Sequence, residues 1–456
     1  MEIKDIVKKQ RDFFHTGATL PVSYRIDALK KLRDIILRYE EEIAEAIRLD
    51  LGKSAFESYM CESGLVLSEI SYMLKHIRSY AREKTVWTPL AQFCSRSYKK
   101  PSPYGVVLIM SPWNYPLMLT LDPLVDAIAA GNTAVLKPSA YSPHTSALIG
   151  KMMAECFEEE YIAVVSGGRE ENQALLDETF DYIFFTGSQT VGKVVMKKAA
   201  EHLTPVTLEL GGKSPCIITK DADLRLAAKR VVFGKYLNCG QTCVAPDYIY
   251  CDATVKDAFI KAVKRQIIRQ YGKRPYKNEN YGKIINQKHY DRIMGLIDQD
   301  KVVLGGSGRA ESLQIAPTVM DGVTFEDAVM QEEIFGPVMP VLTYDSIDEV
   351  VDRLQQMPSP LALYVFTSDK KTADRILSQC SFGGGCINDT IIHLATSEMG
   401  FGGCGASGMG AYHGKDGFDT FTHYKSIVDK KTFMDLPMRY QPYKSIHDRL
   451  IHIFLR

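Results

Sequence analysis

The stretch VVLIMSPWNYPLMLTLDPLVDAIAAGNTAVLKPS, residues 106–139, decides the fold class. Two short apolar runs, 106–110 and 133–136, flank a segment with the length and composition of a helix. Strands that alternate with helices at this spacing predict βαβ units and an open parallel sheet. Each run ends in an unusual sequence, SPWN at 111–114 and KPS at 137–139. Ligands of such sheets bind beyond the carboxyl ends of the strands, so these residues are candidates for a binding site.

The same alternation continues toward the C-terminus. Apolar runs follow at 162–165, 182–185 and 206–210, with helix-compatible segments between them. From Gly211 a second α/β region begins, and its apolar runs are 215–219, 248–251, 301–304, 338–342 and 363–366. We therefore predict an α/β protein with two interlocking lobes, of which the first contains a Rossmann-like open parallel sheet.

The first hundred residues predict helices and one exposed strand. A helical stripe of apolar residues follows Ser23, the expected N-cap. Its members are Ile26, Leu29, Leu32, Ile36, Ile43 and Ile47. A second helical stretch spans about 54–82. Residues 95–103 are short, polar and basic, which suits an exposed strand or a hairpin arm.

Composition and charge exclude several classes of protein. The chain has 456 residues, of which 45% are hydrophobic and 24% charged, as in globular proteins and unlike disordered ones. Lys+Arg and Asp+Glu both number 55, so no net basic charge exists that would attract nucleic acid. No apolar stretch approaches the roughly 18 residues of a membrane span. The first residues lack the apolar core of a secretory signal.

The ten cysteines are dispersed along the chain. None forms a C-x-x-C pair, and no Cys/His cluster has the spacing of a zinc site, so we expect no metal. We interpret them as reduced thiols of a cytoplasmic protein. Their positions are 61, 94, 156, 216, 239, 243, 251, 380, 386 and 404.

Three residues could carry chemistry. In NCGQTCVAP (238–246), Cys243 is a candidate nucleophile, since a thiolate attacks carbonyl carbons and small neighbours permit close approach; the alternative is an ordinary buried thiol. Glu209 ends an apolar run and precedes two glycines, which suits a buried general base, or else a salt-bridged residue at a strand end. Asn114 lies between two prolines, so its amide could be a fixed donor to an oxyanion, or else part of an Asx turn.

FTGSQTVG, residues 185–192, is a further candidate site. It follows an apolar run and opens a helical segment, so it has the form of a strand, a glycine turn and a helix N-terminus. This arrangement receives phosphate groups through free backbone N–H groups. Because the segment is not G-x-G-x-x-G, it is a weak dinucleotide signal by itself.

Together these segments resemble the NAD(P)-dependent aldehyde dehydrogenase superfamily. The matching motifs are, in order, PWNYP, KPS, FTGSxxVG, LELGGK, CGQTC, EEIFGPV and GFGGCGASGMGAYHGKDGFDTFTH, and they cover roughly residues 50–430. The short N-terminus and the SGMGAYHGKxGFDTF segment look like the class 3 branch, which includes fatty and aromatic aldehyde dehydrogenases. The resemblance implies a dinucleotide-binding domain (1–82 and 104–210), a catalytic domain (211–400), and a small β arm for oligomerisation with a C-terminal tail (83–103 and 401–456).

The resemblance also implies roles for single residues. Cys243 matches the nucleophile that attacks the aldehyde carbon, and Asn114 with the Cys243 backbone N–H matches the oxyanion hole. Hydride transfer to the nicotinamide then leaves a thioacyl enzyme, which water activated by Glu209 hydrolyses. Cys239 is interpreted as a bystander. Lys137 matches the residue that binds the adenosine ribose, Gly187 and Ser188 are expected beside the pyrophosphate, and Glu333 with Phe335 matches the contact to the nicotinamide ribose. Further expected cofactor contacts are Trp113, Ser139, Gly192 and Leu210.

Two positions depart from the family pattern. Many NAD-preferring relatives have a glutamate where this chain has Ala140, and it binds the adenosine 2′-hydroxyl. Its absence removes repulsion against a 2′-phosphate, so we expect NAD or NADP as cofactor, and a preference for NADP is the hypothesis. Ala406 replaces a common asparagine, and the sequence offers no mechanistic reading of this change.

The resemblance leaves alternatives for the function. The leading hypothesis is oxidation of a medium- to long-chain aliphatic or aromatic aldehyde to the carboxylic acid, by a homodimer. A CoA-acylating or phosphate-reducing relative would release the acyl group to another nucleophile, but such relatives often lack a glutamate at the position of Glu209. A catalytically idle binding or structural homologue is disfavoured because Cys243, Glu209 and Asn114 are all present.

Overall fold

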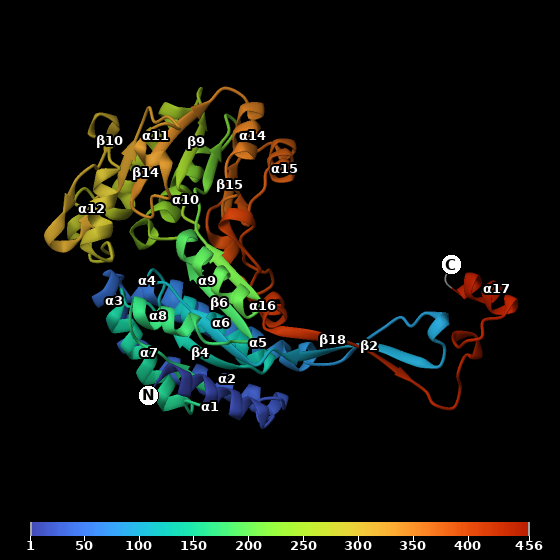
Figure 1. The fold of residues 1–456 in the computed structure, drawn as a ribbon. Coiled ribbons are helices and arrows are strands. Elements are labelled where there is room, and N and C mark those ends of the chain that lie inside the picture. The colour runs from blue at the N-terminus through green and yellow to red at the C-terminus, as the bar shows by residue number, and fades with distance from the viewer. Residues whose placement is uncertain (1, 455–456) are drawn as a thin grey trace.

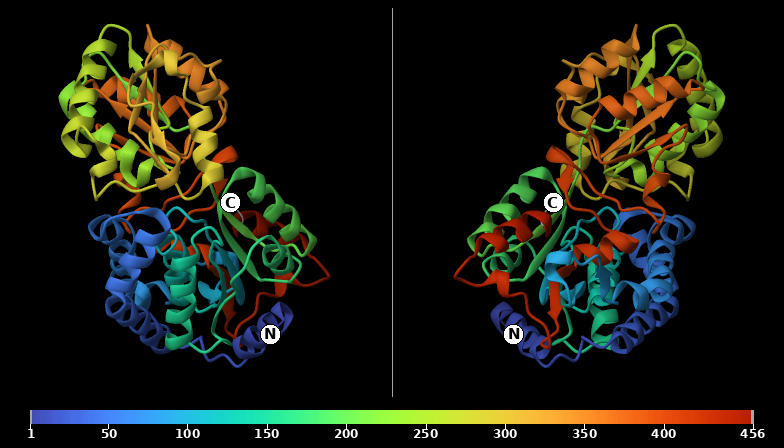
Figure 2. Two further views of the ribbon diagram at one scale, coloured as in Figure 1. Left: turned by 90° about the vertical axis from the view of Figure 1, so that its left-hand side faces the viewer. Right: turned by 90° about the vertical axis from the view of Figure 1, so that its right-hand side faces the viewer.

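The chain folds into two α/β lobes and a protruding arm. The computed structural model describes residues 2–454. Figure 1 shows one lobe built from the N-terminal half, a second lobe above it, and the arm extending to one side, with the C-terminus at its far end. The two views of Figure 2 keep the second lobe stacked on the first. The predicted α/β class with two interlocking lobes is confirmed.

The first lobe is built on a largely parallel sheet. Its strands lie in the order β17-β7-β6-β3-β4-β5, and only β17 runs antiparallel to its neighbour. The strands are β3 (Val106–Met110), β4 (Thr133–Lys137), β5 (Ile162–Val164), β6 (Tyr182–Gly187), β7 (Val206–Leu210) and β17 (Gly408–Met409). The five runs predicted for this sheet are confirmed, each with ends within two residues of the observed strand.

Helices cover both faces of this sheet. Along β3, Val107 and Ile109 pack into one apolar core with helices of the N-terminal segment, whereas Val106, Leu108 and Met110 pack into another. Both faces are therefore buried, which explains why the strand is an uninterrupted apolar run. The helices of this lobe are α1 (Ile3–His15), α2 (Val22–Arg38), α3 (Glu40–Leu51), α4 (Ala55–Ser58), α5 (Gly64–Tyr80), α6 (Met118–Ala130), α7 (Pro143–Cys156), α8 (Arg169–Leu176), α9 (Gln189–Glu201) and α16 (Gly414–Thr420).

The predicted N-cap at Ser23 is wrong. Helix α2 begins at Val22 and Pro21 is its N-cap, so Ser23 lies within the first turn. Proline fixes its own φ near the value of a helix start and needs no N–H partner, which allows the helix to begin earlier than the serine indicated. A serine does cap α4, where Ser54 Oγ accepts a hydrogen bond from the Glu57 N–H at 3.2 Å.

The second lobe has a parallel sheet with one antiparallel edge strand. The order is β10-β13-β14-β9-β8-β15-β16, with β10 antiparallel. Its strands are β8 (Pro215–Ile218), β9 (Tyr248–Asp252), β10 (Val302–Leu304), β13 (Thr318–Met320), β14 (Val338–Tyr344), β15 (Ala362–Phe366) and β16 (Gly384–Ile387), and a hairpin consists of β11 (Gly308–Arg309) and β12 (Gln314–Ile315). Its helices are α10 (Leu224–Tyr236), α11 (Lys256–Tyr271), α12 (Gln287–Gly295), α13 (Ala328–Gln331), α14 (Ile347–Gln356) and α15 (Lys370–Gln379).

The arm is a three-stranded antiparallel sheet, β1 (Lys84–Val86), β2 (Ser95–Pro103) and β18 (Thr422–Lys430). The exposed strand predicted at 95–103 is confirmed as β2. It pairs along its whole length with β18, from Thr422 opposite Pro103 to Lys430 opposite Ser95. Helix α17 (Ser445–Phe454) follows at the tip (Figure 1). Within residues 2–454, none of the helices combines the length and apolar character needed to cross a bilayer.

Candidate active site

A pocket of about 660 Å³ contains most of the predicted site residues. It lies beyond the carboxyl ends of β3, β6 and β7, and residues of the second lobe close it. Its lining includes Asn114, Glu209 and Cys243, the three predicted catalytic residues. The predicted cofactor contacts in its wall are Trp113, Gly187, Ser188, Leu210, Glu333 and Phe335. Ala406, which had no sequence explanation, also lies in the wall.

The loop before Cys243 has an unusual backbone. Asn238, Cys239 and Gly240 lie in succession in the left-handed region, with φ values of 50°, 53° and 75°. A Cβ at Gly240 would collide with the carbonyl oxygen of Gly336, so only glycine fits there. Strained backbone of this kind persists where surrounding contacts enforce it. The buried Gln241 supplies such contacts, since its Nε2 donates to the Asn238 and Lys283 carbonyls at 3.1 and 3.0 Å.

The Cys243 thiol lies at the pocket wall, in surroundings that favour its protonated form. Burial raises its pKa from 9.0 to about 12, and the charges of Glu333 and Glu209 act in the same direction. The backbone N–H groups of Cys243 and Val244 oppose this shift. A base must therefore take the thiol proton before the sulfur becomes an efficient nucleophile. Cys239 is buried elsewhere, with its Sγ near Gly282, which agrees with its interpretation as a bystander.

Glu209 is a buried carboxylate without a hydrogen-bond partner. It is 3% exposed, and neither of its oxygens is hydrogen-bonded within the described part of the chain. The alternative of a salt-bridged residue at a strand end is therefore wrong. Burial raises its pKa well above 4.5, as a base operating near neutral pH requires. Gly408 of β17 pairs with Glu209, and a Cβ at Gly408 would collide with the Leu208 carbonyl, so the SGMG motif needs a glycine there to pair with β7.

The Asn114 side chain is directed toward the nucleophile loop. It is 3% exposed, and its Nδ2 donates to the Gln241 carbonyl at 3.1 Å, not to its own loop. A primary amide carries two N–H donors, so one remains for a ligand in the pocket. The Asn114 carbonyl accepts from Asn238 Nδ2 at 2.8 Å, which ties the same two loops together again. The arrangement suits a preorganised oxyanion donor.

The strand–glycine–helix segment forms one wall of the pocket. Gly187 ends β6, and Ser188 caps α9 by accepting from the Val191 N–H. The free N–H groups at the start of α9 thus border the pocket, as a phosphate group requires. Gly192 lies outside the lining, one turn into α9. A Cβ there would press on the Leu210 side chain at 2.8 Å, so this glycine permits close packing of α9 on β7.

Glu333 and Phe335 lie on the opposite wall. Phe335 has a left-handed backbone, φ 49°, and packs edge-on against Trp113 with ring centroids 5.4 Å apart. Burial, followed by the charge of Asp247, raises the pKa of Glu333 to about 8. The Glu333 carboxylate lies against Gly211, where any Cβ would collide with it. Gly211, the first residue after β7, therefore makes room for this glutamate.

Several pocket residues were missed in the sequence analysis, and Arg292 and His289 are two of them. Arg292 donates to the Glu333 carbonyl at 3.3 Å and to the Ile334 carbonyl at 2.7 Å, which fixes that segment. His289 lies 5.2 Å from Trp113, ring centroid to centroid, and burial followed by nearby Arg292 and Lys288 lowers its pKa to about 4. Both are on α12, where neither residue adjoins a glycine or proline that would mark a site.

Lys137 and Ser139 lie outside the pocket lining. Lys137 is 3% exposed, and its Nζ donates to the carbonyls of Gly167 and Pro138 at 2.8 and 2.9 Å. Ser139 Oγ accepts from the Tyr141 N–H at 3.2 Å, within the turn that leads to α7. Both residues hold the end of β4 in this structure, and their contacts to a cofactor stay predictions.

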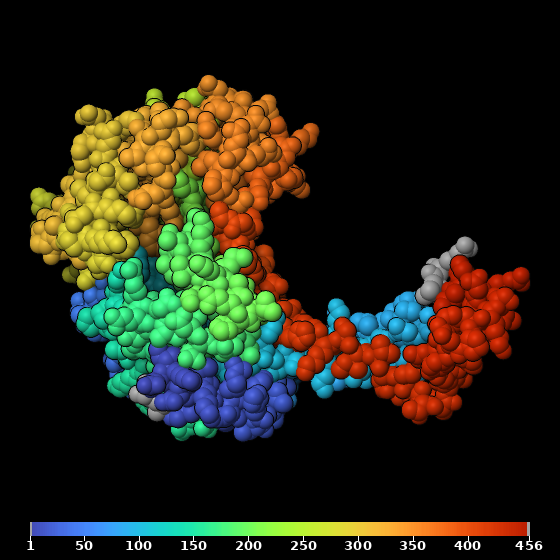
Figure 3. All heavy atoms as spheres, viewed as in Figure 1, coloured from blue at the N-terminus to red at the C-terminus, as the bar shows by residue number. Residues whose placement is uncertain are grey.

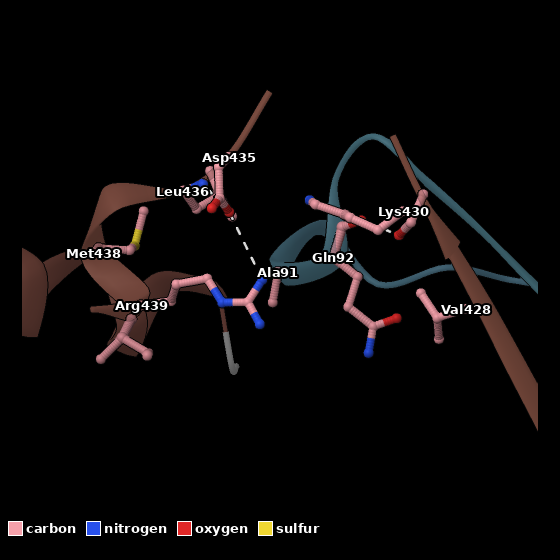
Figure 4. Close-up of a pocket in the computed structure, with 10 residues that line it drawn as sticks. Ala91, Gln92, Val428, Lys430, Asp435, Leu436, Met438 and Arg439 are labelled. Carbon is pink, nitrogen blue, oxygen red and sulfur yellow. Dashed lines mark hydrogen bonds and ion pairs between the residues drawn. The ribbon is translucent and has the colours of Figure 1, made fainter. Parts of the chain in front are cut away.

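A second hollow, of about 500 Å³, lies at the tip of the arm. Figure 4 shows it between the strand end at Lys430 and the turn around Asp435 and Arg439, which form an ion pair at 3.7 Å. Neither a predicted catalytic residue nor a predicted cofactor contact lies in its lining. Residues 2–454 contain no group of three or more His, Cys, Asp or Glu residues arranged to hold a metal ion.

Known proteins resemble this chain along nearly its full length. The aldehyde dehydrogenase family matches residues 1–427. A 4,4'-diaponeurosporen-aldehyde dehydrogenase of Staphylococcus aureus is 47% identical over 434 residues, covering 95% of each chain. The dimeric NADP-preferring aldehyde dehydrogenase of Canis lupus familiaris is 43% identical, covering 97% of this chain and 98% of its own. The substrate-bound structure of Staphylococcus aureus AldH has a TM-score of 0.98 at 45% identity and covers all of both chains.

Proposed function

The chain belongs to the aldehyde dehydrogenase family and is an oxidoreductase, and from this premise we propose how its site works and on what. The reaction is the oxidation of an aldehyde to the carboxylic acid with NAD or NADP as hydride acceptor. The observation that supports this most is the meeting of Asn114, Glu209 and Cys243 in one pocket whose wall is the N-terminus of α9.

The catalytic residues act in sequence in the proposed mechanism. A carboxylate of the pocket, Glu209 or Glu333, takes the Cys243 thiol proton and later releases it to solvent. The sulfur attacks the aldehyde carbon, while the free Asn114 N–H and the Cys243 backbone N–H donate to the developing oxyanion. Bound NAD(P)+ supplies the hydride acceptor, and loss of hydride from the thiohemiacetal carbon leaves a thioester on Cys243. Glu209 takes a proton from water, the resulting hydroxide adds to the thioester carbon, and the C–S bond breaks to release the acid.

The residues around the pocket fit a dinucleotide. Gly187 and Ser188 present the free N–H groups of α9 to a phosphate, and the absence of a side chain at Gly211 leaves the Glu333 carboxylate free to accept from a ribose hydroxyl. The Trp113 and Phe335 rings give this wall an apolar surface.

Two functions are distinguished by what accepts the acyl group from Cys243, which is water in hydrolysis and CoA or phosphate in acyl transfer. A CoA- or phosphate-dependent relative needs no general base for water, whereas Glu209 is buried at the pocket and its pKa is raised. The test is to incubate the enzyme with NAD or NADP and aldehydes of increasing chain length, aromatic ones included. We expect NAD(P)H and free carboxylic acid in equal amounts, without added CoA or phosphate. Product that forms only with CoA or phosphate would contradict the proposal.

The substrate class is proposed from the relatives. The Staphylococcus aureus relative is named for a diaponeurosporen-aldehyde, and mammalian relatives are named dimeric NADP-preferring aldehyde dehydrogenase and aldehyde dehydrogenase family 3 member A2. We propose medium- to long-chain aliphatic or aromatic aldehydes for this chain. Values of kcat/KM, measured for each aldehyde of the series described above, rank the candidate substrates.

A homodimer is the proposed assembly. A relative that covers nearly the whole chain is named dimeric. The arm exposes large apolar side chains, and Trp87 and Phe433 are 80% and 77% exposed. Figure 3 shows a wide open space between the arm and the body of the molecule, where a second copy would bury them. We also propose a reducing compartment such as the cytoplasm, because all ten cysteines are free thiols and Cys243 must stay reduced.

NADP is the cofactor that the Ala140 position favours. Ala140 is exposed just after Ser139 and brings no carboxylate to this turn. Ala140→Glu is expected to lower kcat/KM for NADP relative to NAD about tenfold or more, because a like charge at ~4 Å from a 2′-phosphate costs roughly 1–4 kcal/mol. Steady-state kinetics with both cofactors measures the ratio, and a strong NAD preference of the unchanged enzyme would contradict the proposal.

Turnover should depend on pH through Glu209. The base works only when it is ionised, and its pKa is raised, so activity is present above this pKa and is lost as pH falls through it. We expect kcat under hydrolysis-limited conditions to fall on the acid side with an apparent pKa well above 4.5. The pH profile of kcat is the measurement, and an acid limb near 4.5 would contradict a base with a raised pKa.

A further inference from the structure

A buried ion pair lies directly behind the candidate oxyanion loop. Lys53 follows the C-terminal end of α3, and Glu62 lies in a short π-helical segment, Tyr59–Ser63, between α4 and α5. Lys53 Nζ is 2.7 Å from Glu62 Oε1, and both side chains are fully buried. Burying two charges costs several kcal/mol per ion unless good geometry and further hydrogen bonds compensate. The hydrogen bonds that Lys53 and Glu62 make to other residues therefore indicate which part of the structure the ion pair fixes.

Every proton of the Lys53 ammonium has a partner. The first interacts with Glu62 Oε1, the second is donated to the Asn114 carbonyl at 2.9 Å, and the third faces the ring of Tyr115, whose centroid is 3.9 Å from Nζ. Lys53 thus contacts two consecutive residues, Asn114 and Tyr115, of the loop between β3 and α6.

Glu62 holds the other end of the same loop. Its Oε2 accepts from the Leu117 N–H at 2.9 Å and lies 3.5 Å from the Met118 N–H, at the start of α6. These N–H groups would otherwise lack partners, and a carboxylate at a helix N-terminus is favoured. Together the two side chains fix the backbone from Asn114 to Met118.

This backbone is bound to the nucleophile loop at two further points. The Asn114 carbonyl also accepts from Asn238 Nδ2 at 2.8 Å, and the Tyr115 hydroxyl is 2.6 Å from Thr242 Oγ1, next to Cys243. In addition, Glu57 of α4 accepts from the Asn238 N–H at 2.9 Å. Figure 1 shows α3 and α4 at the junction of the two lobes, where such contacts can set the two loops relative to each other.

We propose that Lys53 and Glu62 are positioning residues that set the distance between the Asn114 amide and Cys243, and thereby the rate of hydride transfer. The inference rests on the proposed function, since it assumes that Asn114 is the oxyanion donor. The pair touches neither substrate nor cofactor. Its effect should therefore appear in the chemical step and not in the affinity for the cofactor.

The test is the variant K53M/E62Q in two backgrounds. Methionine and glutamine keep the volume, and a neutral replacement of a buried pair is often tolerated, whereas the anchor of the Asn114 carbonyl is lost. In the unchanged background we expect the single-turnover rate of NAD(P)H formation to fall about 10- to 100-fold, part of what a lost oxyanion donor costs. In an Asn114→Ala background the same variant should lower the rate by less than about threefold. The amide that the ion pair positions is already absent there, so its displacement can have no further effect. The fluorescence-measured Kd for NAD(P)H should not change.

Several outcomes overturn the inference. A folded K53M/E62Q enzyme with a rate within about twofold of the parent excludes a positioning role, and equal losses in both backgrounds indicate a general structural effect. If K53M/E62Q does not fold, Glu62→Asp keeps both charges and shortens the reach to Leu117; we then expect a loss of about threefold or more that is again absent without Asn114. If the unchanged enzyme forms no NAD(P)H with aldehydes, the proposed function fails instead.

Discussion

Replacing Cys243 by alanine is expected to lower aldehyde-dependent NAD(P)H formation roughly 10⁴- to 10⁶-fold, as the loss of a covalent nucleophile does in other enzymes. Among the described residues, Cys243 is the one cysteine that lines the pocket with Asn114 and Glu209. Without its sulfur no thiohemiacetal forms, and the aldehyde carbon has no route to hydride loss in this site. Stopped-flow absorbance of NAD(P)H, at enzyme concentrations high enough to see one turnover, measures the effect.

Cys156→Ala is the matched control for this prediction. Cys156 ends α7, is half-buried and lies outside the pocket. Its replacement should leave kcat/KM within about twofold, as for substitutions away from the site. Cys243→Ala should still bind NAD(P)H, because its backbone contacts are unchanged. Equal rates of Cys243→Ala and the parent enzyme would place the chemistry elsewhere in the molecule.

The parts of the fold that depend on local pattern could be predicted from the sequence. An apolar run such as 106–110 predicts a buried strand, and this prediction does not depend on which strands pair with it. The position of the strand and of its carboxyl end could therefore be predicted. Parallel strands place these ends at one edge, and Asn114 and Gly187, which follow two of them, do share one pocket. The rule on ligand sites in parallel sheets thus locates this site without knowledge of the reaction.

Contacts between distant segments could not be predicted in the same way. Strand β17 is two residues long and pairs with β7 some 200 residues earlier, a register that no local periodicity encodes. Lys53 and Glu62 look like surface charges in the sequence, because charged residues are almost never fully buried unless paired. The left-handed backbone at Cys239 is enforced by tertiary contacts and not by residue type, because only glycine and, less often, asparagine or aspartate adopt it readily.

Glu209→Gln is expected to separate the two halves of the reaction. The amide cannot take a proton from water, so hydrolysis of the thioacyl enzyme should slow about 10²- to 10⁴-fold. Thiohemiacetal formation and hydride transfer do not need this water, so a burst of one NAD(P)H per active site should remain. Mass spectrometry of the acid-quenched enzyme should then show Cys243 carrying the acyl group, and the steady-state rate should lose the acid limb attributed to Glu209.

The amplitude of the NAD(P)H burst and the steady-state rate together identify the group that accepts the Cys243 thiol proton. Glu209 and Glu333 both line the pocket with Cys243, and the charge of each raises the pKa of the thiol, so both are candidates for the acceptor of the thiol proton. If Glu209 serves only the water, Glu209→Gln retains the burst and Glu333→Gln, which keeps the pocket volume, changes the hydride-transfer step. If the burst disappears in Glu209→Gln while cofactor binding persists, Glu209 also activates Cys243, and one buried carboxylate with a raised pKa carries both proton transfers.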